Sequence, residues 1–177
     1  MAKHCPEGII MYAYCLFCQT QKCKYIASVL EQQGVLRAFS PQIIKRQRIQ
    51  GANVDKQYDL LPGYVFVYSE TELIDNTLFY RVDGLLRRLG TVDNRFALEG
   101  SDLDFALHLY EKNGIVGQVT VFKIGDQVRL DDPLFNGCSG TITEMDYRKE
   151  RAKVSYQFAG MNCFTWVACR MIAAKET

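Results

Sequence analysis

The chain is poor in the residues from which most catalytic sites are built. Among its 177 residues there are only two histidines, His4 near the start and His108 in a segment predicted to be helical. No serine, histidine and acid follow the order of a hydrolase triad, and no phosphate-binding loop or paired-carboxylate site stands out. An enzyme is the first competing interpretation, and these absences argue against it. We therefore predict that the protein is not an enzyme.

Long hydrophobic runs are also missing. Nowhere do about eighteen apolar residues follow one another, so no membrane span is predicted. The start of the chain leads into only a short apolar run and does not resemble a secretory signal. The seven cysteines are an odd number at irregular spacing. These features predict a cytoplasmic protein with reduced thiols.

An excess of charge of one sign is absent as well. The 21 basic and 20 acidic side chains give a net charge of +1. This balance excludes a polybasic binder whose whole surface grips nucleic acid, so any such contact must come from local clusters. The hydrophobic fraction of 48% is ordinary for a globular protein that buries a core.

The cysteines at positions 5, 15, 18 and 23 raise a second competing interpretation, a zinc protein. Their spacing lacks the second close pair of a zinc ribbon. Cys15 and Cys18 form a C-x-x-C motif, but in a predicted strand their sulfurs point to opposite faces, whereas redox motifs of this kind begin a helix. We predict neither a metal nor another cofactor.

The first part of the chain mixes strand and helix patterns. Strands are predicted at 10–18, 35–44, 64–68 and 85–89, and helices at 22–33, 71–77 and 101–110. The segment 45–51 is basic, polar and ends in glycine, so we predict an exposed loop or hairpin tip there. This order is typical of an α+β sandwich of roughly 100 residues.

The last part of the chain has only strand patterns. Residues 112–121 contain two glycines and no period, which predicts a linker. Short strands are then predicted at 127–130, 140–143, 152–156 and 163–167. Several short strands in so few residues favour a small closed barrel, because closure removes exposed strand edges. The predicted domains are 9–111 and 122–177, joined by the linker at 112–121.

Two segments resemble a known family. Leu60-Leu61-Pro62-Gly63-Tyr64-Val65-Phe66-Val67 resembles the Phe-Pro-Gly-Tyr-x-x-Val strand of the NusG N-terminal (NGN) domain. The segments 125–128, 137–140, 145–147 and 151–154 resemble a KOW barrel. The resemblance implies an α+β NGN domain, an antiparallel sheet flanked by helices, followed by an all-β KOW barrel of SH3-like form. It also implies a transcription elongation factor that binds RNA polymerase.

Within this family the sequence is similar to specialised paralogs. Residues 12–33 resemble RfaH, and residues 132–140, 146–153 and 158–160 resemble LoaP. The resemblance implies an operon-specific factor that promotes processive elongation and antitermination. A housekeeping NusG that modulates pausing and Rho termination, and a KOW-type RNA-binding protein with no polymerase role, are the alternatives.

The resemblance also implies a docking surface for the clamp helices of the polymerase largest subunit. The positions that match this surface are Tyr14, Phe17, Leu61 and Tyr64. The competing interpretation is that these side chains fill the domain's own core. Because strand residues alternate between faces, Tyr14 and Phe17 point in opposite directions and are not both interior to a one-sided sheet. Arg88 stands where relatives carry an aromatic residue.

Further contacts follow from the same resemblance. Asp75, Asn76 and Thr77 match a polar tripeptide that touches the opposite pincer of the polymerase. The basic candidates for contact with nascent RNA or non-template DNA are Lys22, Lys24, Lys45, Arg46, Arg48, Arg81, Arg87 and Arg88. In the barrel, Phe158 and Met161 match the site for a small-subunit ribosomal protein or Rho. The competing interpretations are a capped helix end for the tripeptide, solvated surface for the basic residues and a core position for Phe158.

RfaH can fold its C-terminal domain as a helical hairpin. Here the β-branched residues Val119, Thr120 and Val121 and the glycines at 137, 140 and 160 disfavour a helix. We therefore expect a barrel that stays β and gives no fold-switch autoinhibition.

Overall fold

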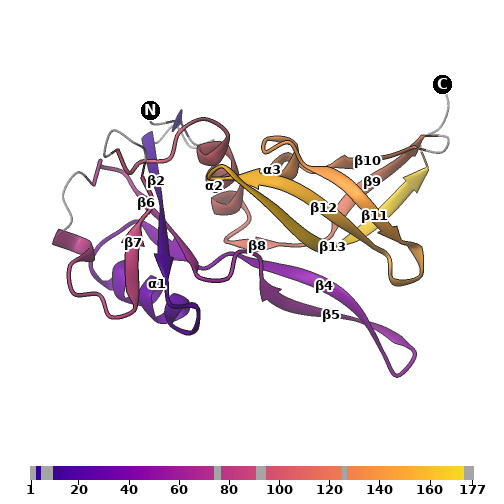
Figure 1. Ribbon diagram of the computed structural model, residues 1–177, viewed down its shortest axis with the longest axis horizontal. Coiled ribbons are helices and arrows are strands. Elements are labelled where there is room, and N and C mark those ends of the chain that lie inside the picture. Colours follow the sequence, from indigo (N-terminus) through magenta and orange to yellow (C-terminus); the bar gives the residue numbers. More distant parts are fainter. Residues whose placement is uncertain (1–2, 5–9, 74–76, 91–94, 125–126, 174–177) are drawn as a thin grey trace. The chain divides into compact units, whose positions relative to one another are not determined.

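The computed structural model describes residues 3–4, 10–73, 77–90, 95–124 and 127–173 (Figure 1). The chain forms two compact units, Met1–Pro41 with Leu61–Gly114, and Gln42–Leu60 with Ile115–Thr177. Each unit is described by itself below. Within the described residues, no helix is long and apolar enough to cross a membrane.

The first unit is built on a five-stranded sheet. Its strands are β1 (Lys3–His4), β2 (Ile10–Cys18), β3 (Arg37–Phe39), β6 (Tyr64–Ser69) and β7 (Leu85–Arg88). The order is β1-β2-β6-β3, with β7 also paired to β2, and every pairing is antiparallel. The strands predicted from the apolar runs at 10–18 and 64–68 are confirmed. Figure 1 shows β2 as the strand that joins β6 and β7.

Helices cover both faces of this sheet. Helix α1 (Cys23–Gln32) follows the 3-10 turn η1 (Thr20–Lys22), and its buried residues form one core with Leu16, Val65 and Val67. The opposite face meets α2 (Gly100–Glu111), where the Tyr68 hydroxyl donates to the Ala106 carbonyl at 2.7 Å. Alternate strand residues therefore belong to different cores, as the period of two requires.

A tight turn precedes β6. Gly63 has φ +85°, and the Tyr64 amide donates to the Leu61 carbonyl at 3.2 Å. Proline followed by a glycine with positive φ is the pattern of a type II turn. The Gly63 carbonyl accepts from the Cys18 amide at 2.7 Å, so the turn is joined to the end of β2.

The second unit contains a long hairpin of β4 (Gln42–Ile49) and β5 (Ala52–Asp59), with β8 (Ile115–Val116) parallel to β4. The segment 45–51, predicted as an exposed loop or hairpin tip, is the end of this hairpin and includes the last part of β4. Only Gln50 and Gly51 form the tip, with φ of 49° and 85°, as the two-residue hairpin turn requires. The strand predicted at 35–44 is divided between β3 and β4, with Pro41 between them.

The rest of the second unit is a five-stranded curved sheet. Its strands are β9 (Val119–Ile124), β10 (Gln127–Asp131), β11 (Thr141–Asp146), β12 (Arg151–Phe158) and β13 (Met161–Ala173), in the order β10-β9-β13-β12-β11. The end strands β10 and β11 also contact each other, which closes the barrel. β13 spans both halves, because its first part pairs with β12 and its last part with β9. This architecture, built mainly of strands, agrees with the expected KOW barrel.

Two short helices interrupt the barrel. Helix α3 (Pro133–Asn136) begins where the Asp132 side chain accepts from the Leu134 amide at 3.0 Å, and η3 (Tyr147–Lys149) follows β11. In the segment predicted as a linker, 112–121, the structure has β8 and the first three residues of β9. The helix predicted at 71–77 is not seen at Glu72 and Leu73, and a 3-10 turn, η2 (Thr77–Phe79), begins at its last residue.

Candidate functional site

Three side chains from adjacent strands form a row at one end of the first unit's sheet. Phe17 on β2 pairs in register with Tyr64 on β6 and with Arg87 on β7. The two rings lie 5.4 Å apart between centroids, and the Arg87 guanidinium carbon lies 5.8 Å from the Phe17 centroid. Phe17 and Tyr64 are half-buried and Arg87 is exposed. We call Phe17, Tyr64 and Arg87 the aromatic row.

The aromatic row lies where the cover of α2 ends. Met11, Ala13 and Cys15 share the face of Phe17 and are buried. Phe17, two residues after Cys15, is the first of this series to keep exposed surface. Gly63 permits this arrangement, because a Cβ there would lie 3.5 Å from the Phe17 ring and 3.3 Å from the Cys18 carbonyl oxygen. The row is therefore held on rigid strands next to a fixed turn.

Two residues predicted to share this surface lie in the core. Tyr14 is 1% exposed, and its hydroxyl accepts from the Leu73 amide at 2.7 Å. Burial raises the pKa of its phenol, while the Leu73 amide lowers it. Leu61 is 6% exposed. Strand alternation turns Tyr14 toward the α1 side. Both residues, predicted to line the docking surface, are buried in the first unit.

Arg88 fills an aromatic cage on the α1 side of β7. Its guanidinium carbon lies 3.8 Å from the Phe96 ring centroid, 5.0 Å from Phe79 and 5.7 Å from Tyr14. Its Nη1 donates to the Leu73 carbonyl at 2.9 Å. Beside it is a hollow of about 360 Å³, lined by Phe79, Tyr80, Leu85, Leu86, Arg87, Arg88 and Phe96. Arg88 therefore stabilises the packing of the unit and is a poor candidate for phosphate contact.

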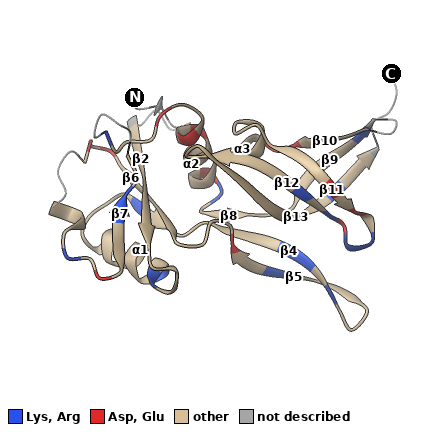
Figure 2. Ribbon diagram, viewed as in Figure 1, with Lys and Arg blue, Asp and Glu red and all other residues tan. Residues whose placement is uncertain are grey.

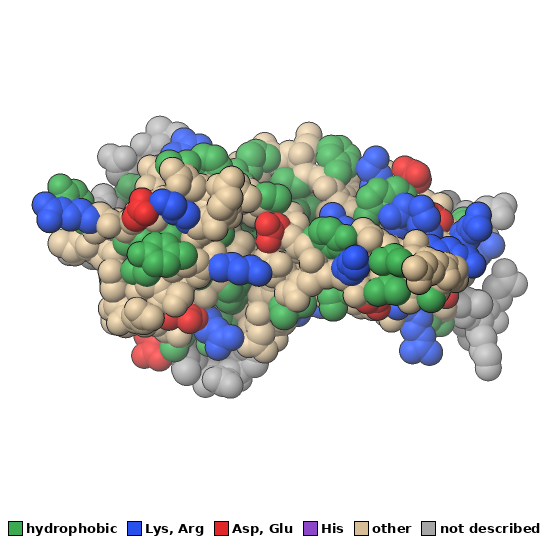
Figure 3. Space-filling view, turned by 90° about the horizontal axis from the view of Figure 1, so that it is seen from below, with side chains coloured by type: hydrophobic (Ala, Val, Ile, Leu, Met, Phe, Trp, Pro, Cys, Tyr) green, Lys and Arg blue, Asp and Glu red, His purple; other side chains and the backbone are tan. Residues whose placement is uncertain are grey.

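Figure 2 marks the Lys and Arg positions on the ribbon, and the other basic candidates differ in their contacts and exposure. Several are engaged: Lys22 with Asp83 at 2.6 Å, Lys45 over the Tyr58 ring at 5.4 Å, and Arg81 over the Tyr80 ring at 5.5 Å. Lys24, Arg48 and Arg87 are exposed, and so is Arg81 despite its contact with the Tyr80 ring. In Figure 3, hydrophobic and basic side chains lie next to one another over one face of the molecule. The exposed group is the one that can meet an anion.

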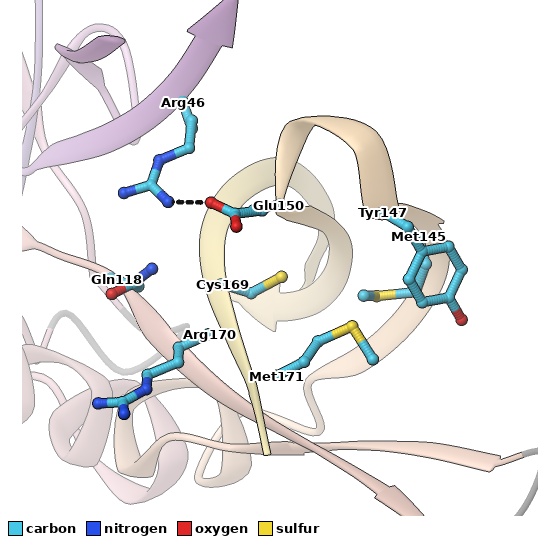
Figure 4. A pocket seen from close by; sticks show the side chains of 8 residues that line it. All are labelled: Arg46, Gln118, Met145, Tyr147, Glu150, Cys169, Arg170 and Met171. Carbon is cyan, nitrogen blue, oxygen red and sulfur yellow. Dashed lines mark hydrogen bonds and ion pairs between the residues drawn. The ribbon is translucent and has the colours of Figure 1, made fainter. Parts of the chain in front are cut away.

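Arg46 is the most strongly paired of these cations. Its guanidinium donates to both Asp55 carboxylate oxygens, at 2.8 and 3.0 Å, and to Glu150 at 2.5 Å. The hydrogen bond from Arg46 lowers the pKa of Asp55. A hollow of about 550 Å³ beside it is lined by Arg46, Gln118, Met145, Tyr147, Glu150, Cys169, Arg170 and Met171 (Figure 4). Glu150 lies 104 residues from Arg46 in the sequence, so no local sequence pattern predicts this ion pair.

Comparison with known proteins decides the family. The model described as "Transcription termination factor nusG" matches residues 12–104, the range that holds the aromatic row. The chain belongs to the NusG family. This family consists of transcription factors and not enzymes, and its members act in transcription termination and antitermination.

Two relatives and one solved structure agree with this assignment. The transcription termination/antitermination protein NusG of Vibrio vulnificus is 29% identical over 140 residues, 74% of this chain and 75% of that protein. NusG of Vibrio cholerae is 25% identical with the same coverage. The structure of Thermotoga maritima NusG covers 89% of this chain and 93% of its own, with a TM-score of 0.52 and 18% identity. The likeness to that structure supports the shared fold.

The remaining candidates of this NusG-family chain are placed as follows. Phe158 and Met161 were both predicted to meet a partner. Phe158 is fully buried in the barrel, whereas Met161 is 39% exposed at the start of β13. The two residues are paired across a turn in which Ala159 and Gly160 have positive φ. Thr77 is exposed at the start of η2, and Asp75 and Asn76 lie outside the described residues.

The described cysteines are free thiols, and Cys15, Cys18 and Cys23 are buried. Burial raises the pKa of Cys18 to about 12, which disfavours the thiolate that binds metal or attacks disulfides. No group of three or more His, Cys, Asp or Glu that could hold a metal ion occurs among the residues with a described position. Cys5 falls outside them.

Proposed function

We propose that this NusG-family protein binds RNA polymerase through the aromatic row, which docks on the clamp helices of the largest subunit. The observation that carries the proposal is the half-exposed Phe17–Tyr64 pair on paired strands, with the Arg87 cation beside it. Aromatic and arginine side chains of this kind dominate the energy of protein interfaces. Rigid strands lower the entropy that binding costs.

We further propose that bound protein promotes processive elongation as an operon-specific paralog. A factor that binds one state of the polymerase more tightly makes that state more populated. A second contact at Asp75, Asn76 and Thr77 adds to this preference by holding the clamp closed around DNA. The resemblance of residues 132–140 and 146–153 to a specialised paralog supports this choice over a housekeeping factor.

Nucleic acid and a second protein complete the proposal. Lys24, Arg48 and Arg81 are the exposed cations that contact phosphates of nascent RNA or non-template DNA. Each neutralised phosphate makes binding more dependent on salt. Met161, rather than the buried Phe158, is the residue that would meet a small-subunit ribosomal protein or Rho.

Binding to core RNA polymerase tests the first step. We expect Phe17→Ala and Tyr64→Ala each to raise the dissociation constant by about 30-fold. This is the effect of losing an interface anchor of about 2 kcal/mol. The matched control is Tyr25→Ala, because Tyr25 is 56% exposed on α1, which covers the other face of the sheet. Circular dichroism verifies that each variant is folded. If folded Phe17→Ala binds as well as Tyr25→Ala, the surface has been misplaced.

Transcription in vitro tests the second step. The template carries the leader of the protein's own operon followed by an intrinsic terminator, and readthrough is measured with and without the protein. We expect the wild-type protein to increase readthrough of the terminator, and Phe17→Ala to leave readthrough at the level seen without protein. Unchanged readthrough with wild type, on a polymerase that it binds, contradicts antitermination and leaves the docking surface intact.

A further inference from the structure

The outer face of the barrel carries two adjacent rows of side chains. Strand alternation turns Ala152, Val154, Tyr156 and Phe158 of β12 inward, and all four are buried. The outward residues of β12 are Arg151, Lys153, Ser155 and Gln157, and the outward residues of β13 beside them are Asn162, Phe164 and Trp166. We call these seven residues the barrel platform. They belong to none of the sites described above.

Two aromatic rings stand on the barrel platform. Phe164 is 61% exposed, a large fraction for a phenylalanine, and pairs with Ser155 across the strands. Trp166 is half-buried and pairs with Lys153. Two residues apart on one strand, the rings are separated by about 7 Å along β13. The Phe164 ring is open to solvent, and Trp166 keeps part of its surface exposed.

The neighbours of the rings are cationic or polar. The Arg151 guanidinium carbon lies 4.4 Å from the Trp166 ring centroid, and Asp146 holds Arg151 in place at 3.1 Å. Lys153 forms a loose ion pair, at 3.9 Å, with Glu144 of the neighbouring strand β11. The platform itself, all of it described, contains no aliphatic side chain, and both of its cations lie opposite carboxylates on β11, Lys153 opposite Glu144 and Arg151 opposite Asp146. The two rings therefore stand among polar and charged side chains.

We propose that the barrel platform binds single-stranded RNA. Bases stack on Phe164 and Trp166, while Lys153 and Arg151 lie beside them for the phosphates, the combination by which single strands are held. The hydroxyl and amides of Ser155, Gln157 and Asn162 supply donors and acceptors for base edges and for the 2′-hydroxyl that DNA lacks. The site is separate from the aromatic row, so the proposal does not depend on polymerase docking.

Trp166 makes the proposal directly measurable, because it is the only tryptophan of the chain. The full-length protein is titrated with short oligouridine and oligoadenine RNA, with DNA of the same sequence, and with an RNA duplex, while tryptophan fluorescence is recorded. We expect saturable quenching by the RNA single strands, weaker quenching by DNA and little by the duplex. No quenching by RNA overturns the proposal, as does equal quenching by the duplex. Equal quenching by DNA overturns the assignment to RNA.

Substitutions separate stacking from general attraction. Phe164→Ala should weaken RNA binding by about 5- to 100-fold, the range measured for loss of one base–aromatic stack. Tyr147→Ala is the matched control, because Tyr147 is 58% exposed on the same barrel but lies in η3, outside the platform. Lys153→Gln should reduce the salt slope of binding by about one. Equal affinities of the Phe164 and Tyr147 variants would overturn the proposal.

A protein occupant is the competing outcome. The small-subunit ribosomal protein is titrated under the same conditions, with Trp166 fluorescence as the signal. Quenching that requires Phe164 and occurs with the ribosomal protein, but not with RNA, overturns the RNA assignment. Since Phe164 is exposed, Phe164→Ala is expected to fold normally. Trp166→Phe keeps a ring for stacking and should retain RNA binding measured by anisotropy of a labelled oligomer, and loss of that binding contradicts the proposal.

Discussion

Removing the Arg88 side chain should destabilise the first unit, although arginine is usually a surface residue. Its guanidinium lies over the rings of Phe96, Phe79 and Tyr14 and donates to the Leu73 carbonyl. The family resemblance predicts an aromatic residue at this position, and in this chain a stacked cation lies among the rings. Arg88→Ala therefore removes packing, cation–π attraction and a hydrogen bond together.

The magnitude follows from the contacts. A cation over an aromatic face contributes about 0.5–2 kcal/mol, the larger value when it is desolvated. A hydrogen bond from a charged donor contributes about 1.5–3 kcal/mol. Arg88 is only half-buried and these contributions are not additive, so we expect Arg88→Ala to lower the free energy of unfolding by about 2–4 kcal/mol. Arg88→Met, which keeps an unbranched apolar side chain, should cost about half as much.

The assay must report on the first unit alone. Trp166 lies in the second unit, so tryptophan fluorescence follows the barrel. Hydrogen exchange of the β2 amides, measured by mass spectrometry, follows the sheet that Arg88 supports. The matched control is Arg87→Ala, because Arg87 is exposed and lies 5.8 Å from a single ring, and it should change stability by no more than about 0.5 kcal/mol.

The comparison with Arg87→Ala decides the matter. If Arg88→Ala and Arg87→Ala change the β2 exchange rates equally, the cage contributes nothing and our reasoning is refuted. If Arg88→Phe is as stable as wild type, the cage accepts either a ring or a stacked cation. That result would explain how this position tolerates both residue types.

Three further predictions concern pH, backbone and thiols. Arg46 lowers the pKa of Asp55 below its usual value, so their ion pair stabilises the fold above about pH 4 and is lost as the pH falls further. Asp55→Asn should therefore cost less than about 1 kcal/mol at neutral pH and nothing near pH 2. Thermal stability measured across an acid titration tests this. Gly63→Ala should cost about 1–3 kcal/mol in urea unfolding because Gly63 has φ +85°, whereas Gly117→Ala, with open space around its Cβ, should be nearly neutral. In peptide mapping after brief alkylation, half-buried Cys163 should be labelled before Cys18, which is 2% exposed, and the reverse order would contradict the assigned burial.

The elements that the sequence predicted well are those with a buried face. β2, β6 and α1 lie close to their expected bounds because each has the apolar period of its structure type. A hairpin tip was predicted near 45–51, but strand β5 was not, because β5 is exposed along nearly its whole length and has no apolar alternation to detect. Helix α3 has four residues, too few for a helical period, and only Asp132-Pro133 marks its start.

The candidate site was half predictable for the same reason. Alternation along β2 correctly separated Phe17 from Tyr14, but it gave no information about which face a helix covers and where that cover ends. Leu61, predicted for the same surface, is 6% exposed and lies in the turn before β6, where strand alternation gives no guidance. The cage around Arg88 was invisible, since its rings come from positions 14, 79 and 96.

Position along a strand thus determines whether an aromatic residue builds the fold or remains available to a partner. On β2 the same face is buried at Cys15 and partly open at Phe17, and on β12 and β13 the inward rings are buried while Phe164 is open. In both units the open rings stand on paired strands next to a cation, Arg87 in one and Lys153 in the other. A rigid strand fixes such a ring at no cost to the core, so a family fold can retain its packing while the outward positions change partner. Substitutions at Phe17 and Phe164 should therefore alter binding. At Phe164, the more exposed of the two, the free energy of unfolding should change by no more than about 1 kcal/mol.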